Sequence, residues 1–250
     1  MSSASATTAP NQFAVVTGGL SGIGAAIGRT ILGAGFRLFI FDQDEGRCEQ
    51  FLNSLNAGRD RVTCWKVNLC EPEQIIQAFQ NLRQETDRLD VMVNNAGIAC
   101  IDDITQPHQP ILDQMLSVNL LAVMVCTQEA LSLMLPHRRG RIIYIASSAA
   151  IHPLPFQALY SATKAGILAL ARALRAELRE SGITQTTICP GPTVTNILQN
   201  FPQDFIERHR VLEEPRLSAQ DIARIVEILI SYPDSVSLDE VLITPALHPL

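Results

Sequence analysis

Charged and aromatic residues are scarce in this sequence. Only 18% of its 250 residues are Asp, Glu, Lys or Arg, only 5% are aromatic, and 47% are hydrophobic. That is too little charge for a disordered chain, so we expect a compact globular protein. The 19 basic and 25 acidic residues give a net charge of −6, and no basic cluster offsets it. This balance disfavours nucleic acid as a partner.

Other features are missing as well. The six cysteines form no CxxC pair, so neither a disulfide framework nor a zinc site is predicted, and all six are expected to be reduced thiols. No cluster of His, Asp or Cys has the spacing of metal ligands, so no metal is expected. The first basic residue is Arg29, which argues against a targeting peptide. The longest uninterrupted apolar run, 120–126, is far shorter than the roughly 18 residues of a membrane span. We expect a cytoplasmic protein that contacts no membrane.

The chain reads as one domain. Residues 1–11 are small, polar and aperiodic and are expected to form a flexible tail, and residues 12–250 a single domain. Short apolar runs alternate with helical patterns, which predicts a doubly wound parallel α/β sheet of about seven strands, of the Rossmann type. The predicted strands are 13–16, 37–41, 61–67, 91–93, 141–145, 184–189 and 241–243.

A glycine-rich turn follows the first predicted strand. Residues 17–24 read TGGLSGIG and open an apolar helical stripe that runs to Ala34. Glycines let the backbone turn tightly and approach a pyrophosphate, whose charge then meets the free N–H groups at the helix N-terminus. The turn therefore predicts a dinucleotide site; the alternative is a strand-to-helix turn that binds nothing.

Asp42 ends the second predicted strand, 18 residues after Gly24. An acidic side chain about 20 residues after such a turn binds the adenosine ribose. At ~4 Å and an effective dielectric of ~20, its carboxylate would repel the 2′-phosphate of NADP by about 4 kcal/mol. Neither Ser21 nor Gln43, the expected neighbours, is positively charged, so we expect NAD as the cofactor. The alternative for Asp42 is a solvated acid in a turn.

Four motifs make the chain similar to the single-domain short-chain dehydrogenases/reductases, from residue 13 to about residue 243. They are TGGLSGIG at 17–24, NNAG at 94–97, a Ser147, Tyr160 and Lys164 constellation, and PGPTVT at 190–195. In that family Ser lies 13 residues before Tyr and Lys four after it, as here. The family's further active-site Asn, in a Val-Asn-Leu context, corresponds to Asn119.

The resemblance implies a role for each residue. Tyr160 would be the general acid/base, Ser147 would bind the reacting oxygen, and Lys164 would lower the Tyr pKa and hold the nicotinamide ribose. Asn119 would anchor a water that links Lys164 to solvent, and Thr195 would contact the nicotinamide carboxamide. The implied cofactor-binding set is Gly18, Ser21, Gly22, Ile23, Gly24, Asp42, Asn68, Leu69, Asn95, Ala96, Gly97, Tyr160, Lys164, Pro190, Gly191, Thr193 and Thr195.

The spacing of Tyr160 and Lys164 has a physical meaning of its own. At i and i+4 of a helix, both side chains leave the same face. An ammonium ~4 Å from a phenol in a partly screened site would lower the phenol pKa by about three units, from about 10 to near 7. A group with that pKa can exchange the substrate's hydroxyl proton while a cofactor takes the hydride.

The sequence departs from the family pattern at two places. Asn68 stands where the family usually has an Asp that meets the adenine amine, and the glycine-rich C-terminal ending is replaced by residues 241–245, VLITP. The second departure puts the usual subunit contact there in doubt.

The substrate is less well defined. The segment 149–156 is mostly apolar and in the family lines the substrate, which favours an apolar alcohol or ketone. His152 could orient a polar group, alongside Ser147 and Tyr160. Residues 190–215 are expected to form a substrate lid, in which Arg208 and Arg210 could meet a carboxylate.

The sequence predicts an NAD-dependent oxidoreductase that interconverts a secondary alcohol and a ketone. The alternatives are a hydroxy-acid dehydrogenase or acyl-type reductase of the same family, and a catalytically silent NAD-binding regulatory or scaffold protein. The helices predicted at 112–135 and 157–180 are apolar on more than one side, as expected for helices that pair with another subunit. We therefore expect a homodimer or homotetramer.

Overall fold

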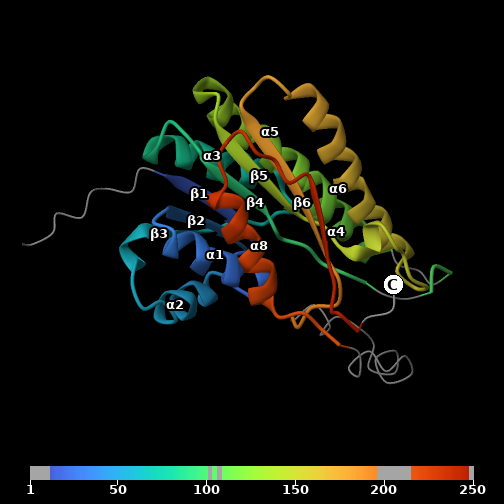
Figure 1. The fold of residues 1–250 in the computed structure, drawn as a ribbon. Helices are drawn as coiled ribbons and strands as arrows, with labels where there is room; N and C mark the ends of the chain where they lie inside the picture. Colours follow the sequence, from blue (N-terminus) through green and yellow to red (C-terminus); the bar gives the residue numbers. More distant parts are fainter. Residues whose placement is uncertain (1–11, 101–102, 106–108, 196–214, 248–250) are drawn as a thin grey trace, which may run out of the picture.

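Seven parallel strands form one central sheet in the computed structural model, which describes residues 12–100, 103–105, 109–195 and 215–247 (Figure 1). The strand order is β3-β2-β1-β4-β5-β6-β7. The strands are β1 (Phe13–Thr17), β2 (Arg37–Asp42), β3 (Val62–Lys66), β4 (Val91–Asn94), β5 (Gly140–Ile145), β6 (Ile183–Pro190) and β7 (Glu240–Ile243). The predicted Rossmann-type α/β fold is confirmed, and each strand end lies within one residue of its predicted position. The predicted tail, 1–11, and most of the predicted lid, 196–214, lie outside the described residues.

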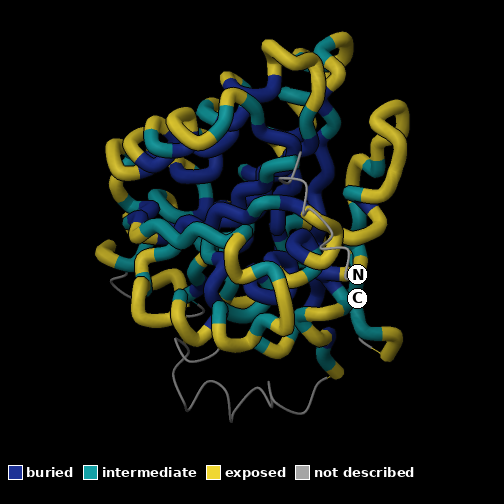
Figure 2. The backbone as a smooth tube through the Cα atoms, turned by 90° about the vertical axis from the view of Figure 1, so that its left-hand side faces the viewer, coloured by how far each residue is buried: buried dark blue, intermediate teal, exposed yellow. Residues whose placement is uncertain are grey.

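Helices cover both faces of the sheet because successive strand side chains point to opposite sides. Phe39 and Phe41 of β2 face one hydrophobic core, which α3, α5 and α6 complete, whereas Leu38 and Ile40 face a second core under α1, α2 and α8. The helices are α1 (Gly22–Gly33), α2 (Gly46–Asn53), α3 (Pro72–Glu85), α4 (Gln109–Leu116), α5 (Ala122–Met134), α6 (Ala158–Glu177) and α8 (Ala219–Ser231). Buried residues accordingly gather in the middle of the molecule and exposed ones on its outer turns (Figure 2).

One long helical stretch runs from Gln109 to His137 where the sequence predicts a helix over 112–135. It consists of α4, a π-helical turn η2 (Ser117–Leu121), α5 and a short 3₁₀ turn η3 (Leu135–His137). By length and composition alone this stretch could span a membrane, but 44% of its most apolar window is buried inside the protein. The buried helix of a protein core passes the same test. The wider π-helical turn lies where Asn119 enters the core, 0% exposed.

The expectation that all six cysteines are thiols is wrong for two of them. Cys48 of α2 and Cys64 of β3 form a disulfide. Cys64 pairs in register with Ile40 of β2, so its side chain faces the helix layer that contains α2. No spacing in the sequence indicates this pairing, because the two positions meet only when α2 packs on the sheet. Only Phe51 of α2 is fully buried, so the disulfide is a main attachment of this short helix.

Replacing both cysteines, Cys48→Ser with Cys64→Ser, is expected to lower the free energy of unfolding by about 3 kcal/mol. The disulfide closes a loop with a sequence separation of 16, and a loop of that size restricts the unfolded chain by about this amount. Denaturant titration of the oxidised and the reduced protein measures the difference. Reductant should destabilise the parent and leave the double variant unchanged; a parent that is insensitive to reductant would contradict the prediction.

Candidate functional site

The predicted site residues converge at the carboxyl ends of β1, β4, β5 and β6. The glycine turn follows β1, the NNAG segment continues from β4, Ser147 follows β5, and the PGPTVT segment begins with the last residue of β6. Strands β1 and β4 are neighbours in the sheet, and the order of strands along the chain reverses between them. In open α/β sheets, ligands bind in the crevice at this reversal.

The glycine turn has the shape that a pyrophosphate requires. Gly18 and Gly22 have φ angles of 62° and 50°, which favour glycine. A side chain at Gly24 would collide with the carbonyl oxygen of Gly18. Ser21, the N-cap residue of α1, makes no capping bond with its side chain, so the first N–H groups of the helix have no side-chain acceptor. These groups fit an anionic diphosphate.

The NNAG segment holds the turn in place. The amide Nδ2 of Asn95 donates to the carbonyl oxygens of Thr17 at 2.9 Å and Gly18 at 3.1 Å. The backbone N–H groups of Asn95 and Ala96 donate to the Thr17 hydroxyl at 3.0 and 3.1 Å. The predicted cofactor residues of these two segments are thus joined directly, although about 78 positions separate them in sequence.

Gly24→Ala is expected to abolish measurable dinucleotide binding, because its Cβ would also lie 2.5 Å from Nδ2 of Asn95 and push the turn open. Calorimetric titration with NADH measures this. Gly33→Ala is the matched control on the same helix, since a Cβ at Gly33 meets nothing within 4 Å. That variant should bind as the parent does and unfold at an equal or higher temperature. Normal binding by the Gly24 variant would show that the turn does not form the site.

Asp42 lies beside the glycine turn. Its carboxylate accepts hydrogen bonds from the backbone N–H of Leu20 and of Asp44, both at 3.2 Å. It therefore lies against the glycine turn, where the sequence argument expected it. The Oδ1 of Asn68 accepts from the N–H of Cys70 at 3.1 Å, which holds the turn after β3 in place. Leu69 beside it is buried.

Ser147 and Tyr160 meet through their side chains. Their hydroxyl groups lie close enough to interact, and this interaction tends to lower the Tyr160 pKa. The Ser147 Oγ also accepts from the backbone N–H of Ala149 at 3.1 Å, which orients the side chain. Ser147 is the N-cap of the short 3₁₀ turn η4 (Ser148–Ala150), and Tyr160 lies in the first turn of α6. The two predicted residues are thus brought together.

Lys164 lies one turn further along α6 and is almost fully buried. Its Nζ donates to the carbonyl oxygen of Ile145 at 3.0 Å and lies 5.8 Å from the centre of the Tyr160 ring. A Cβ on Gly97 would lie 3.1 Å from this Nζ and 3.4 Å from the Asn119 Oδ1. Lys164, Gly97 and Asn119 therefore share one small space, as the predicted site requires.

The side chain of Asn119 is held by protein groups. Its Oδ1 accepts from the N–H of Ile98 at 2.9 Å, while its Nδ2 donates to the Ile98 carbonyl at 2.8 Å and to the Thr163 hydroxyl at 3.1 Å. These bonds join the π-helical turn to α6 and to the segment after the NNAG motif.

The expected pKa of Tyr160, near 7, is wrong. Removal of its hydroxyl from water raises the Tyr160 pKa, and the interaction with Ser147 only partly opposes this. Burial likewise lowers the pKa of Lys164 to about 8. The sequence argument counted the attraction between the two groups and omitted desolvation, which disfavours both charged forms.

Lys164→Met is expected to stabilise the protein at pH 7 by up to about 3 kcal/mol, although it removes a predicted site residue. The folded-state pKa of about 8 lies below the usual 10.5, so the ammonium costs stability at all pH values below about 8. This cost shrinks as pH rises toward 10.5, where the amine is neutral in both states. Denaturant titrations at pH 7 and pH 10 measure the change. A variant that is less stable than the parent at pH 7 would refute this account.

The PGPTVT segment faces the glycine turn. A Cβ on Gly22 would lie 3.6 Å from the Thr195 side chain, so the two segments approach each other across the site. Thr193 donates through its hydroxyl to the Gly191 carbonyl at 2.9 Å and pairs with Leu217 in an isolated bridge. His152 is exposed on the turn after η4. Arg208 and Arg210 lie outside the described residues.

Cys189 was not predicted as part of this neighbourhood. It is fully buried at the end of β6, accepts a backbone hydrogen bond from Ser147 and lies close enough to Lys164 to interact with its charge. Burial raises the pKa of its thiol to about 11. Its place just before the PGPTVT motif was the only sequence signal.

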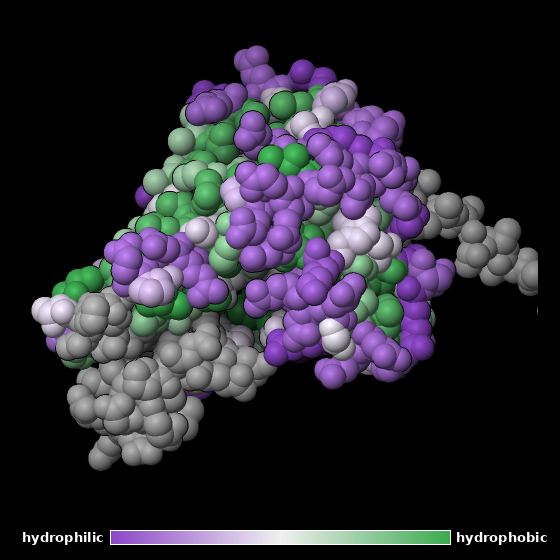
Figure 3. Space-filling model, turned by 180° about the vertical axis from the view of Figure 1, so that it is seen from behind, coloured by the Kyte–Doolittle hydropathy of each residue, from purple (hydrophilic) through white to green (hydrophobic). Residues whose placement is uncertain are grey.

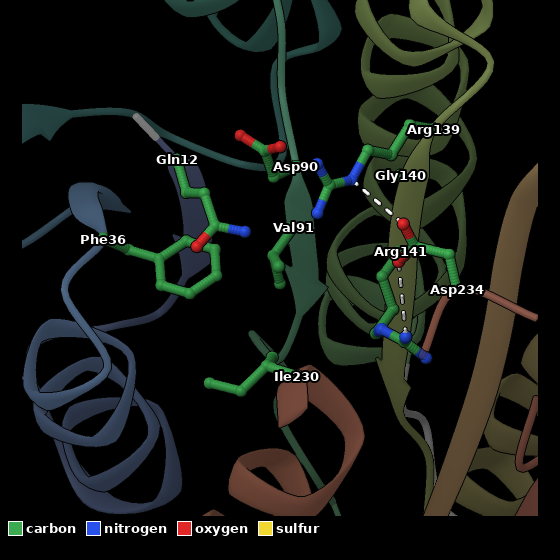
Figure 4. Close-up of a pocket in the computed structure, with 9 residues that line it drawn as sticks. All are labelled: Gln12, Phe36, Asp90, Val91, Arg139, Gly140, Arg141, Ile230 and Asp234. Carbon is green, nitrogen blue, oxygen red and sulfur yellow. Dashed lines mark ion pairs between the residues drawn. The ribbon is translucent and has the colours of Figure 1, made fainter. Parts of the chain in front are cut away.

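A separate cavity lies at the opposite end of the sheet, at the amino ends of β1, β4 and β5 (Figure 4). Asp90, Arg139 and Arg141 are among its lining residues. Its volume of about 30 Å³ leaves room for only a few water molecules, since one needs roughly 10–15 Å³. It is therefore too small for a dinucleotide or an organic substrate. Among the described residues, no three His, Cys, Asp or Glu side chains form a group that could hold a metal ion.

Comparisons with known proteins agree with the fold. The sequence model of the short chain dehydrogenase family matches residues 12–205. The putative ketoacyl reductase 1 of the granaticin polyketide synthase of Streptomyces violaceoruber is 33% identical over 213 residues, which cover 83% of this chain and 77% of that protein. An uncharacterized oxidoreductase of Staphylococcus epidermidis is 31% identical over 94% of this chain and 97% of its own. The chain therefore belongs to the short chain dehydrogenase family and is an oxidoreductase.

Solved structures show the same architecture. A metagenomic short-chain oxidoreductase in complex with NADP is 26% identical and superposes with a TM-score of 0.79, covering 96% of this chain and 99% of that one. A serine dehydrogenase complexed with NADP+ superposes with a TM-score of 0.87 over 96% of this chain and 97% of that one, at 21% identity. The second likeness concerns the fold alone.

Proposed function

We propose that this protein is a nicotinamide-dependent oxidoreductase that interconverts a secondary alcohol and a ketone. The observation that carries the proposal is the close approach of the Ser147 and Tyr160 hydroxyls, with Lys164 one helical turn away, at the sheet edge that also holds the glycine turn. Burying an ammonium beside a phenol costs hydration free energy, and neither an ordinary helix surface nor a scaffold protein requires such an arrangement. This arrangement argues against the catalytically silent alternative.

The residues present fit a nicotinamide dinucleotide. The open N–H groups at the start of α1 would hold the diphosphate, Asp42 the adenosine ribose, Lys164 the nicotinamide ribose, and Thr195 the carboxamide. When bound, the cofactor supplies the hydride acceptor or donor. The protein's own task is then to orient the substrate oxygen and to move one proton.

Tyr160 would move that proton. Because burial raises its pKa, the phenol is protonated at neutral pH and can donate to a ketone oxygen held by Ser147. In the reverse direction the phenolate must form, which the positive charge of Lys164 favours. The alcohol-oxidation rate should therefore rise with pH above neutrality until Lys164, with its pKa of about 8, loses its proton.

We propose NAD as the preferred cofactor because the Asp42 carboxylate lies at the glycine turn, where a 2′-phosphate would meet its charge. Reduction of a ketoacyl group is the second candidate, supported by the ketoacyl reductase among the relatives. The apolar segment 149–156 beside Ser147 suits either substrate. We also propose that the protein is cytoplasmic; in a reducing compartment, Cys48 and Cys64 would be thiols for part of the time.

A homodimer or homotetramer is part of the proposal. Four large apolar side chains between α4 and η3, Leu116, Leu121, Met124 and Leu135, are each at least 40% exposed. On the face seen in Figure 3, hydrophobic residues gather toward the left and hydrophilic ones cover the centre. Burying such side chains against a second copy would stabilise a pair of subunits.

Tyr160→Phe is expected to lower kcat by about 10²- to 10⁴-fold, the usual contribution of general acid–base catalysis, and to leave the Kd for NADH within about twofold. NADH formation over a panel of secondary alcohols, with binding measured by calorimetry, tests both values.

Tyr232→Phe is the matched control, because Tyr232 is exposed at the end of α8, far from the site in sequence and in the fold. It removes the same hydroxyl group without touching Ser147 or Lys164. A Tyr160→Phe variant as active as the control would refute the proposed proton transfer.

A further inference from the structure

Lys66 lies beside Asp42 although 24 positions separate them. The register of β2 and β3 pairs Asp42 with Lys66, the last residues of their strands. Adjacent parallel strands lie about 4.8 Å apart, and paired residues point to the same face. Trp65 packs on Phe39 and Phe41 on the opposite face, which leaves Lys66 on the face of Asp42 and of the glycine turn.

The ammonium of Lys66 is available to a ligand. The residue is exposed, and no carboxylate of the described residues lies within the 4.0 Å of an ion pair. The nearby acids are already engaged: Asp44 pairs with Arg47 at 2.8 Å, and Asp42 accepts the two backbone hydrogen bonds described above. Lys66 is therefore a free positive charge at the adenosine end of the proposed cofactor site.

We infer that Lys66 is a cofactor-specificity residue that binds the 2′-phosphate of NADP and allows the protein to use NADP as well as NAD. This inference rests on the proposed dinucleotide site. A 2′-phosphate placed between β2 and β3 would meet the Asp42 carboxylate and the Lys66 ammonium at similar distances, so attraction by one offsets repulsion by the other. The thousandfold discrimination expected from Asp42 alone is then reduced to about a hundredfold, because a hydrogen bond to a charged group is worth about tenfold in affinity.

The test measures the Kd of NADH and of NADPH by calorimetry for the parent, Lys66→Met and Lys66→Arg. In Lys66→Met the ratio of the NADPH Kd to the NADH Kd should rise by about tenfold, and in Lys66→Arg it should stay within about threefold of the parent. Raising the ionic strength should weaken NADPH binding by the parent more than by Lys66→Met, because salt screens an exposed charge.

Arg224→Met is the matched control for the loss of one positive charge. Arg224 is exposed on α8 and, among the residues that the structure describes, pairs with Asp221 of its own helix at 3.5 Å, so this variant should keep the parent's ratio. Lys66→Gln provides a second neutral variant in case the methionine variant fails to fold.

The outcomes separate the two proposals. If the parent binds neither dinucleotide, the proposed function fails. If the parent binds NADH and the ratio in both neutral Lys66 variants equals that of Arg224→Met, the site stands and Lys66 has no part in specificity. A parent that discriminates by a thousandfold also overturns the inference, because Asp42 then acts without compensation.

Discussion

The candidate site depends on one buried ammonium. Lys164 is 3% exposed, and the hydrogen bond that fixes its Nζ goes to the carbonyl of Ile145 at the end of β5. A charge in such a place loses its hydration, which appears as a pKa lowered to about 8. The surrounding structure is arranged to tolerate it: Gly97 leaves space for the amine, and Asn119 joins the π-helical turn to the segment around it. Lys164 therefore lies at the centre of the candidate site although its buried charge does not stabilise the folded protein.

The same desolvation acts on the Tyr160 phenol, so it shifts the pKa values of both groups that would handle the proton. With its hydroxyl removed from water, Tyr160 favours its neutral, proton-donating form, and the buried Lys164 holds its proton only weakly. Two groups with opposed preferences, one helical turn apart on α6, can pass a proton in either direction at modest cost. A reversible oxidoreductase needs this property. Stability and chemistry are therefore in conflict at Lys164, as is usual for residues in active sites.

Much of this protein could be predicted from its sequence because the signals were local. Continuous apolar runs gave all seven strands within one residue at each end, since a parallel sheet buried on both faces admits few polar side chains. The spacing of Tyr160 and Lys164 placed both on one helical face, and the glycines at 18 and 22 do adopt the positive φ angles that the turn needs. The pKa of Tyr160 was wrong because desolvation depends on what packs around a group, and no spacing reveals that.

The sequence by itself determined the fold class and the family and predicted the candidate site residues, because each rests on periodicity or on short motifs within one segment. Only the tertiary structure decided which distant residues became neighbours. Strand register put Lys66 beside Asp42, helix packing joined Cys48 to Cys64, and the meeting of β5 and β6 brought Cys189 to Ser147. Such contacts follow from how elements pack on the sheet. The environment of a residue therefore depends on segments far away in the sequence, and the residues next to it in the chain do not show which segments these are.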